Sequence, residues 1–267
     1  MRWNWWIPGI VASLLLAQEA RADTIYVSDN GGGLHAYDTG TGASTLIGTT
    51  SAGAMLDIAI DRSGQLYGLN SGGGLYRIST TDASVSLVGS NSRSLNALAF
   101  DASGALYGSS EFGGLYTLDV ATGSASLVNA IKEGAVEYRS SGDLVFDAGG
   151  TLFLSTTTND LVRVDPTNGN ATRVGRHGKS LLYGLAYDRS GVLYGFQRNS
   201  LIWTIDPTTA AATFEAVGPF GFGAAGNPFP SSGGPVPEPG TLVLFGSALA
   251  AGMGARRHRR SRVTTSS

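Results

Sequence analysis

Residues 95–119 read LNALAFDASGALYGSSEFGGLYTLD, three short apolar runs separated by two glycine-containing breaks. In the break DASG, the aspartate and the serine can bond the backbone of a turn, and the glycine takes the positive φ that closes it. Aromatic and apolar runs of about five residues, with a glycine every few positions, are unfavourable for long helices. The stretch therefore predicts consecutive antiparallel β-strands joined by tight turns.

The pattern of this stretch recurs along the chain. The aromatic residue of its middle run has counterparts at intervals of 40, 41 or 46 residues, at Tyr26, Tyr67, Tyr107, Phe153 and Tyr194. Further apolar runs lie between the units, at 55–61, 95–101, 142–147 and 181–188. A period near 40 residues with four strands in each unit is typical of a β-propeller blade.

The predicted fold is all-β: a β-propeller of about five four-stranded blades over residues 23–226. The repeats lie near 24–64, 65–104, 105–150, 151–191 and 192–226. The first unit has no inner strand of its own. We expect the segment 219–225, PFGFGAA, to supply that strand and close the ring, although its glycines are unfavourable in a strand. A sixth blade would need a further unit, which the sequence does not contain.

The charge and the cysteine count exclude several classes of function. The net charge is −2, yet five arginines lie in the tail after Ala255, so the body is more acidic than the total suggests. An acidic body argues against nucleic-acid binding, which depends on neutralising phosphates. The chain has no cysteine, which excludes disulfides, thiol catalysis and zinc–thiolate sites.

The N-terminal residues 1–22 have the three parts of a secretory signal peptide. Arg2 supplies the positive start, residues 5–17 are apolar, and Ala20-Arg21-Ala22 forms an A-x-A cleavage signal. Cleavage after Ala22 would leave Asp23 as the first residue of the mature protein. A buried core helix is the alternative interpretation of the apolar stretch.

The C-terminal residues 236–262 combine three elements. Val236-Pro237-Glu238-Pro239 is followed by an uncharged stretch, 241–255, and then by Arg256, Arg257, Arg259 and Arg260. A helix over 241–255 would rise about 22 Å, which is short of the membrane hydrocarbon thickness of about 30 Å. The arginines would stop transfer and stay on the cytoplasmic side, with the body outside. Residues 227–235 are a predicted linker, and 263–267 are a tail.

The order of these three elements resembles the PEP-CTERM sorting signal of Gram-negative bacteria. The resemblance implies an exosortase as partner, which reads the segment in the inner membrane and cuts near Pro-Glu-Pro. The body would then be periplasmic and anchored before processing, and afterwards lie at the cell surface or outside the cell. Because the family usually occurs with exopolysaccharide and biofilm genes, the resemblance also implies an exopolysaccharide as a candidate partner. An ordinary tail anchor is the alternative.

Variable loops on one face of the predicted propeller form a candidate ligand-binding face, because variable loops on a rigid scaffold usually carry binding sites. Its residues are Arg93, Lys132, Glu133, Arg139, Arg176, His177 and Lys179. A cationic patch on an acidic protein would suit an anionic sugar or a carboxylate. The alternative interpretation is that these charged residues only face solvent and bind no ligand.

No catalytic motif is found in the sequence, so no catalytic residue, cofactor or metal is predicted. The Asp-x-Ser-Gly turns lack the run of oxygen ligands that calcium needs, and the single loop histidine His177 makes no zinc site. The favoured function is a non-enzymatic binding or structural protein of the cell surface or extracellular matrix. The alternative is a periplasmic or surface propeller enzyme, a lyase or a glycosidase, that acts on a polysaccharide.

Overall fold

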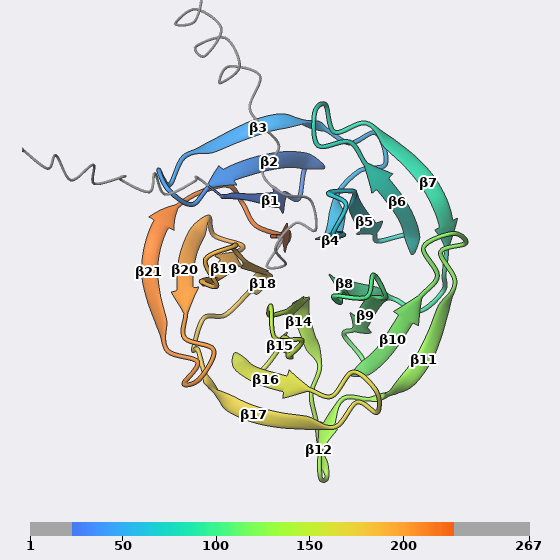
Figure 1. Cartoon of the computed structure of the whole chain (residues 1–267), viewed down its shortest axis with the longest axis vertical. Helices are drawn as coiled ribbons and strands as arrows, with labels where there is room; N and C mark the ends of the chain where they lie inside the picture. Colours follow the sequence, from blue (N-terminus) through green and yellow to red (C-terminus); the bar gives the residue numbers. More distant parts are fainter. Residues whose placement is uncertain (1–22, 227–267) are drawn as a thin grey trace, which may run out of the picture. The chain divides into compact units, whose positions relative to one another are not determined.

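The computed structural model describes residues 23–226, which form five four-stranded antiparallel sheets arranged around a central axis (Figure 1). Within these residues the structure is all-β, so the predicted five-bladed propeller is confirmed. None of the described residues belongs to a helix long and apolar enough to cross a membrane. The predicted signal peptide, linker, sorting segment and tail lie outside the described residues.

Each blade runs from an inner strand at the axis to an outer strand at the rim. Blade 1 contains β22 (Gly223–Ala225), β1 (Thr24–Ser28), β2 (Gly33–Asp38) and β3 (Ser44–Thr49). Blade 2 contains β4 (Met55–Ile60), β5 (Leu66–Asn70), β6 (Gly74–Ile78) and β7 (Val85–Ser90). Blade 3 contains β8 (Leu95–Phe100), β9 (Leu106–Ser110), β10 (Gly114–Leu118) and β11 (Ala125–Ala130).

The remaining two blades follow the same order. Blade 4 contains β14 (Ser140–Phe146), β15 (Leu152–Thr156), β16 (Asp160–Val164) and β17 (Ala171–Arg176). Blade 5 contains β18 (Leu182–Tyr187), β19 (Leu193–Gln197), β20 (Leu201–Ile205) and β21 (Ala212–Val217). A two-stranded hairpin, β12 (Lys132–Glu133) and β13 (Val136–Glu137), lies in the connection between blades 3 and 4.

The ring closes as the sequence predicts, because β22 pairs antiparallel with β1 and aligns Gly223 with Ser28. The closing strand has only three residues. Its first glycine is required by the packing rather than tolerated: a Cβ on Gly223 would overlap the carboxyl of Asp57 and lie 2.5 Å from its Cα. Glycine in this segment therefore reflects a close approach of two backbones at the axis.

The hydrophobic core consists of clusters between neighbouring blades. One cluster between blades 5 and 1 places the fully buried Tyr37 edge-on to Tyr194 and Phe196, with ring centroids 6.0 and 5.7 Å apart. The leucines that repeat in the sequence, such as Leu75 and Leu115, are fully buried in two further clusters. Packing between blades thus holds the propeller together, and no disulfide contributes.

The two faces of the propeller differ in their connections. Turns that follow the inner strands are built as predicted: Asp61 accepts hydrogen bonds from the backbone N–H of Ser63 and of Gln65 at 2.8 and 2.9 Å. Because turns alternate between the two ends of an antiparallel blade, these turns share a face with Asp23 and Gly226. We call it the terminal face. The opposite face, the loop face, carries the connections between blades and the loops between second and third strands.

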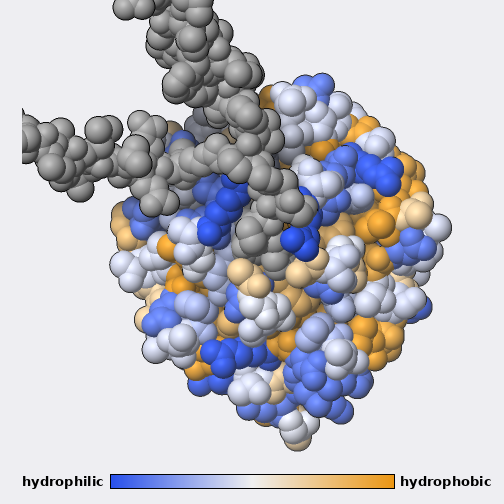
Figure 2. Space-filling view, viewed as in Figure 1, coloured by the Kyte–Doolittle hydropathy of each residue, from blue (hydrophilic) through white to orange (hydrophobic). Residues whose placement is uncertain are grey.

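The rim exposes apolar side chains at a position that repeats from blade to blade, and Figure 2 shows hydrophobic surface there. On the outer strands of blades 1, 2, 3 and 5 the residues are 52% to 61% exposed: Leu46, Leu87, Leu127 and Phe214. In blade 4 the same register position holds Arg173. The β12–β13 hairpin lies against this outer strand through a bridge between Lys132 and Asn170, and it projects at the rim (Figure 1).

Candidate ligand-binding cavity

A cavity of about 770 Å³ opens on the loop face, around the axis. All five blades contribute to it. Its floor is formed by the second residue of β4, β8 and β18, by the third residue of β14, and by Phe222 directly before β22: Leu56, Asn96, Tyr183, Gly142 and Phe222. Core positions repeat, as in the leucines Leu66, Leu106, Leu152 and Leu193 that begin the second strands of blades 2 to 5, whereas the five floor positions hold a different residue in every blade. The repeat is therefore broken where a ligand would be contacted.

One side of the cavity is aromatic. The rings of Tyr183 and Phe222 meet edge to face with centroids 5.7 Å apart, and Phe220 stacks on Phe222 at 6.0 Å. The guanidinium of Arg198 lies 5.7 Å from the Phe220 ring centroid. Gly142 provides the space for Tyr183, because a Cβ there would lie 3.0 Å from the Tyr183 backbone. The φ of +153° at Gly142 also favours glycine.

The other side of the cavity is polar. The Nδ2 of Asn96 donates to the carbonyl of Ser140 at 3.3 Å, and its Oδ1 is buried without a hydrogen-bond partner among the described residues. Further amide and hydroxyl side chains surround the opening, among them Asn70, Asn91, Asn159, Ser94, Ser141 and Ser180. Of the described lining residues, only Glu111 and Arg198 are charged at neutral pH, and their charges are opposite.

Two aspartates lie in the layer directly below the floor. Asp57 and Asp143 are fully buried, and burial raises the pKa of both carboxyls. The nearby charge of Asp57 raises the pKa of Asp143 further. Because Asp57 acts to raise the pKa of Asp143, whereas Asp143 acts to lower that of Asp57, we expect Asp143 to be the carboxyl that keeps its proton to higher pH.

The aspartate pair joins blades rather than facing a ligand. Asp57 of blade 2 accepts the N–H of Leu98 in blade 3 at 2.6 Å. Asp143 of blade 4 accepts the N–H of Leu185 in blade 5. Neither aspartate is among the residues that line the cavity. The pair therefore satisfies backbone donors of the inner strands at the axis.

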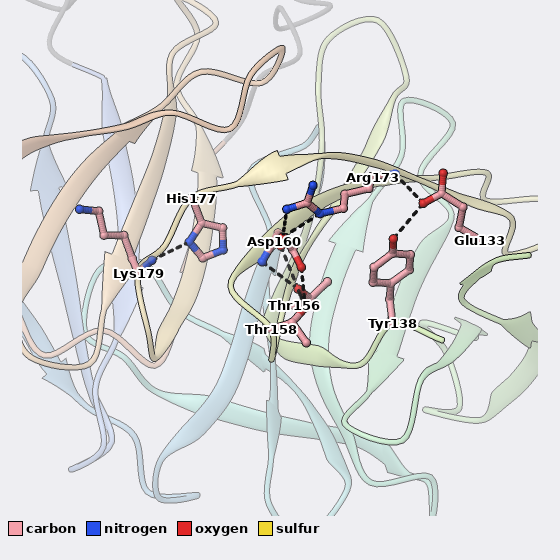
Figure 3. A network of polar contacts seen from close by, with 8 residues as sticks. All are labelled: Glu133, Tyr138, Thr156, Thr158, Asp160, Arg173, His177 and Lys179. Atoms are coloured by element: carbon pink, nitrogen blue, oxygen red, sulfur yellow. Dashed lines mark hydrogen bonds and ion pairs between the residues drawn. The ribbon is translucent and has the colours of Figure 1, made fainter. Parts of the chain in front are cut away.

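Several residues of the sequence-predicted face form a polar network at the rim (Figure 3). Glu133 of the hairpin accepts hydrogen bonds from the Tyr138 hydroxyl at 2.9 Å and from the Arg173 N–H at 3.2 Å. Burial and the neighbouring Glu133 raise the pKa of Tyr138 to about 12. Arg173 in turn donates to Asp160 at 2.6 and 2.9 Å, and this ion pair lowers the pKa of Asp160 despite its burial.

His177 is buried, and burial lowers its pKa to about 4, so its imidazole is neutral. Its Nδ1 accepts the N–H of Lys179 at 3.2 Å, which places the proton on Nε2. That Nε2 lies 3.4 Å from the hydroxyl of Ser155, which donates to the carbonyl of Leu182. Since the imidazole donates to the serine instead of accepting its proton, this pair is structural and not a nucleophile with its base.

None of the seven residues of the predicted ligand-binding face lines the cavity. Arg93, Arg139 and Arg176 are exposed, and the ammonium of Lys179 lies 3.6 Å from the Trp203 ring centroid. Glu111 and Arg198, which lie on the loop face, do line the cavity. The floor residues were not singled out from the sequence. The signal that would have found them is the residue five positions before the turn aspartate of each inner run, which differs from blade to blade.

Comparisons with known proteins bear on the termini and on the fold. Residues 235–260 match the family described as the PEP-CTERM protein-sorting motif. No curated protein matches the chain. A structural genomics protein of unknown function from Bacteroides thetaiotaomicron aligns with a TM-score of 0.53 at 12% identity, over 79% of this chain and 66% of that one. This likeness supports the fold alone.

A second solved structure, the hydrazine synthase of Kuenenia stuttgartiensis, aligns with a TM-score of 0.43 at 14% identity, over 60% of this chain and 47% of that one.

The motif match and the fold agree with the sequence analysis, because the motif follows a complete ring of blades. The chain is an exported five-bladed β-propeller protein that carries a PEP-CTERM sorting motif.

Proposed function

We propose that this protein is cut by an exosortase, reaches the cell surface or the extracellular matrix, and there binds a segment of an extracellular polysaccharide in its axial cavity without altering it chemically. The observation that carries the proposal is the cavity itself. Its volume of about 770 Å³ lies within the range of ligand sites, about 300–1,000 Å³. A purely structural matrix component would have no need for such a cavity.

The side chains around the cavity favour binding over catalysis. Glycoside hydrolysis ordinarily uses two carboxyl groups that flank the bond to be cut. Among the described lining residues there is one carboxylate, Glu111, on the loop between β9 and β10. The two aspartates below the floor accept backbone N–H groups of the neighbouring blades and do not line the cavity. We therefore favour a binding protein over a lyase or a glycosidase.

The topology of blade 1 supports display at a surface. Gly226, from which the chain continues to the sorting motif, lies on the terminal face because β22 runs antiparallel to β1. The cavity opens on the loop face. The point of attachment and the binding site thus use opposite faces of the propeller, and a cell-linked protein would offer its cavity to ligands outside.

Mass spectrometry of the protein from the surface of its host tests the sorting step. We expect a C-terminus near Pro237–Pro239, and the full C-terminus in cells that lack the exosortase. An intact arginine-rich tail on the surface form would contradict processing.

To test binding, the full-length chain in detergent is titrated with extracellular polysaccharide by calorimetry, and the polymer is then sized by chromatography. Shortened polymer would favour the enzyme.

A further inference from the structure

We infer that the axial cavity recognises an uncharged sugar ring, which packs its apolar face on the wall formed by Tyr183 and Phe222 and donates a hydroxyl proton to Oδ1 of Asn96. The inference rests on the proposed binding function and names the chemistry of the ligand. Aromatic rings offer an apolar surface to the C–H groups of a sugar, and an amide oxygen offers an acceptor to its hydroxyls.

The first support is the orientation of the Asn96 amide. Its Nδ2 donates to the carbonyl of Ser140 at 3.3 Å, which fixes the other atom as an acceptor. That Oδ1 is buried and has no donor among the described residues. Because a buried acceptor without a donor is unfavourable, a ligand hydroxyl that donates to this oxygen would relieve that cost on binding.

The second support is the aromatic wall, for which a glycine in the neighbouring blade leaves the space. Tyr183 lies where blade 2 has Leu56 and blade 4 has Gly142. The absence of a Cβ on Gly142 leaves the space against Tyr183, at 3.0 Å from its backbone. The ring of Phe222 meets Tyr183 at 5.7 Å and continues the same surface. Both side chains are partly exposed, which a purely structural pair in a core would not require.

The third support is the charge of the lining. Glu111 and Arg198 are the charged members among the described lining residues, and they cancel. The remaining polar groups are hydroxyls and amides, which both donate and accept, as the hydroxyls of a sugar do. An anionic sugar would instead need cationic groups that converge on it. The basic residues predicted from the sequence, such as Arg176 and Lys179, lie outside the cavity.

The test is calorimetric titration of the full-length chain in detergent with two sets of probes. One set contains neutral gluco-, galacto- and manno-oligosaccharides, and the other contains uronic-acid oligosaccharides of matched length. We expect at least one neutral probe to bind. Two variants, Asn96→Leu and Tyr183→Leu, place at the floor the residue that blade 2 has at the same position, so the inner strand tolerates it. Each should weaken binding at least tenfold.

The double variant Arg176→Ala/Lys179→Ala is the matched control, and it should bind the neutral probe as the parent does. Thermal melting of every variant shows whether the propeller is folded. The inference is overturned if neutral probes bind equally well to folded Asn96→Leu and Tyr183→Leu. Binding of uronic-acid probes alone, unchanged in the double variant, would overturn the inference and leave the proposed function standing. Loss of that binding in the double variant would place the site outside the axial cavity and overturn both proposals. Binding of neither probe set, with intact polysaccharide still bound, would overturn it too. If the polysaccharide does not bind either, both proposals fail.

Discussion

Asp57 and Asp143, from the inner strands of blades 2 and 4, lie close together in the buried centre of the propeller, and burial raises the pKa of both carboxyls. Their roles differ. The two oxygens of Asp57 accept the N–H groups of Ile58 and Leu98 at 2.8 and 2.6 Å. Asp143 accepts the N–H of Leu185 with one oxygen, and its other oxygen has no hydrogen-bond partner in the described structure.

The variant Asp143→Asn should be more stable than the parent at neutral pH. Because the pKa of Asp143 is raised in the folded state, the folded protein holds its proton where the unfolded chain has released it. Stability from this group is present below pH 3.8, the unfolded pKa, and is lost as the pH rises toward the folded pKa. The loss is about 1.4 kcal/mol for each unit of pKa difference. Asparagine keeps its protons, so urea unfolding from pH 4 to pH 8 should show a flatter profile.

The matched control is Asp57→Asn, which should destabilise the protein. Its amide would direct a donor at one of two backbone N–H groups, and leave that N–H buried without an acceptor. The expected loss of unfolding free energy is about 1–3 kcal/mol. Equal effects of the two substitutions would contradict the assignment of the proton to Asp143.

His177 should titrate near pH 4 in the folded protein, because burial lowers its pKa to about 4 from 6.5. Because the pKa of His177 is lower in the folded state, the imidazole of the unfolded chain is protonated at a higher pH than that of the folded protein when the pH falls. Stability is therefore complete above pH 6.5 and is lost as the pH falls toward 4, by up to about 1.4 kcal/mol for each pH unit. The measurement is the NMR titration of the imidazole Cε1–H. A midpoint near 6.5 would show that the ring is solvated instead.

Arg173→Leu should destabilise the protein even though leucine is the residue of blades 1, 2 and 3 at this position. The change removes the ion pair and leaves Asp160 with the hydroxyl of Thr158. Since the Arg173 side chain is 47% exposed and solvent screens the pair, the expected loss of stability at pH 7 is small.

The pH dependence of that loss gives a sharper measurement. The pair lowers the pKa of Asp160, so its contribution is present above pH 3.8 and lost as the pH falls through the folded pKa. Arg173→Leu and the parent should therefore converge in stability at low pH. A double-mutant cycle with Asp160→Asn isolates the pair, and a coupling free energy of zero would contradict its contribution.

The sequence predicted the blades because structural positions repeat. Leu75 and Leu115 are needed in the same place in each blade, so the period exposes them. The cavity residues were missed for the converse reason: Asn96 and Tyr183 share no residue type with their counterparts. The Asp57–Asp143 contact joins blades that are not neighbours along the chain, and only the curvature of the ring brings them together.

The path of the loops explains why some residues of the predicted face lie at the rim. A connection between blades starts at an outer strand and ends at the next inner strand, so its first residues are peripheral and its last are axial. Lys132 and Arg176 lie at the start of such connections. Ser94 and Ser180 lie close to the end of theirs, and both line the cavity. From residue types alone, the sequence does not show which residues of a connection lie at its rim end and which lie at its axial end.

Gly223→Ala should weaken the closure of the ring. A Cβ at this position would overlap the Asp57 carboxyl and lie 2.5 Å from the Asp57 Cα and 3.0 Å from the N of Ile58. Because two of these atoms belong to the backbone, β22 would have to move away from β4. The expected cost is about 1–3 kcal/mol of unfolding free energy.

Gly31→Ala is the control for this change, since its Cβ would approach only the side chain of Asp29, at 3.3 Å. Hydrogen exchange at the amides of β1, which pairs with β22, measures the closure directly. We expect faster exchange there in Gly223→Ala than in Gly31→Ala, and unchanged exchange in blade 3. Equal exchange of β1 in the two variants would mean that the short closing strand adds little to the stability of the ring, and that packing between blades 5, 1 and 2 is sufficient.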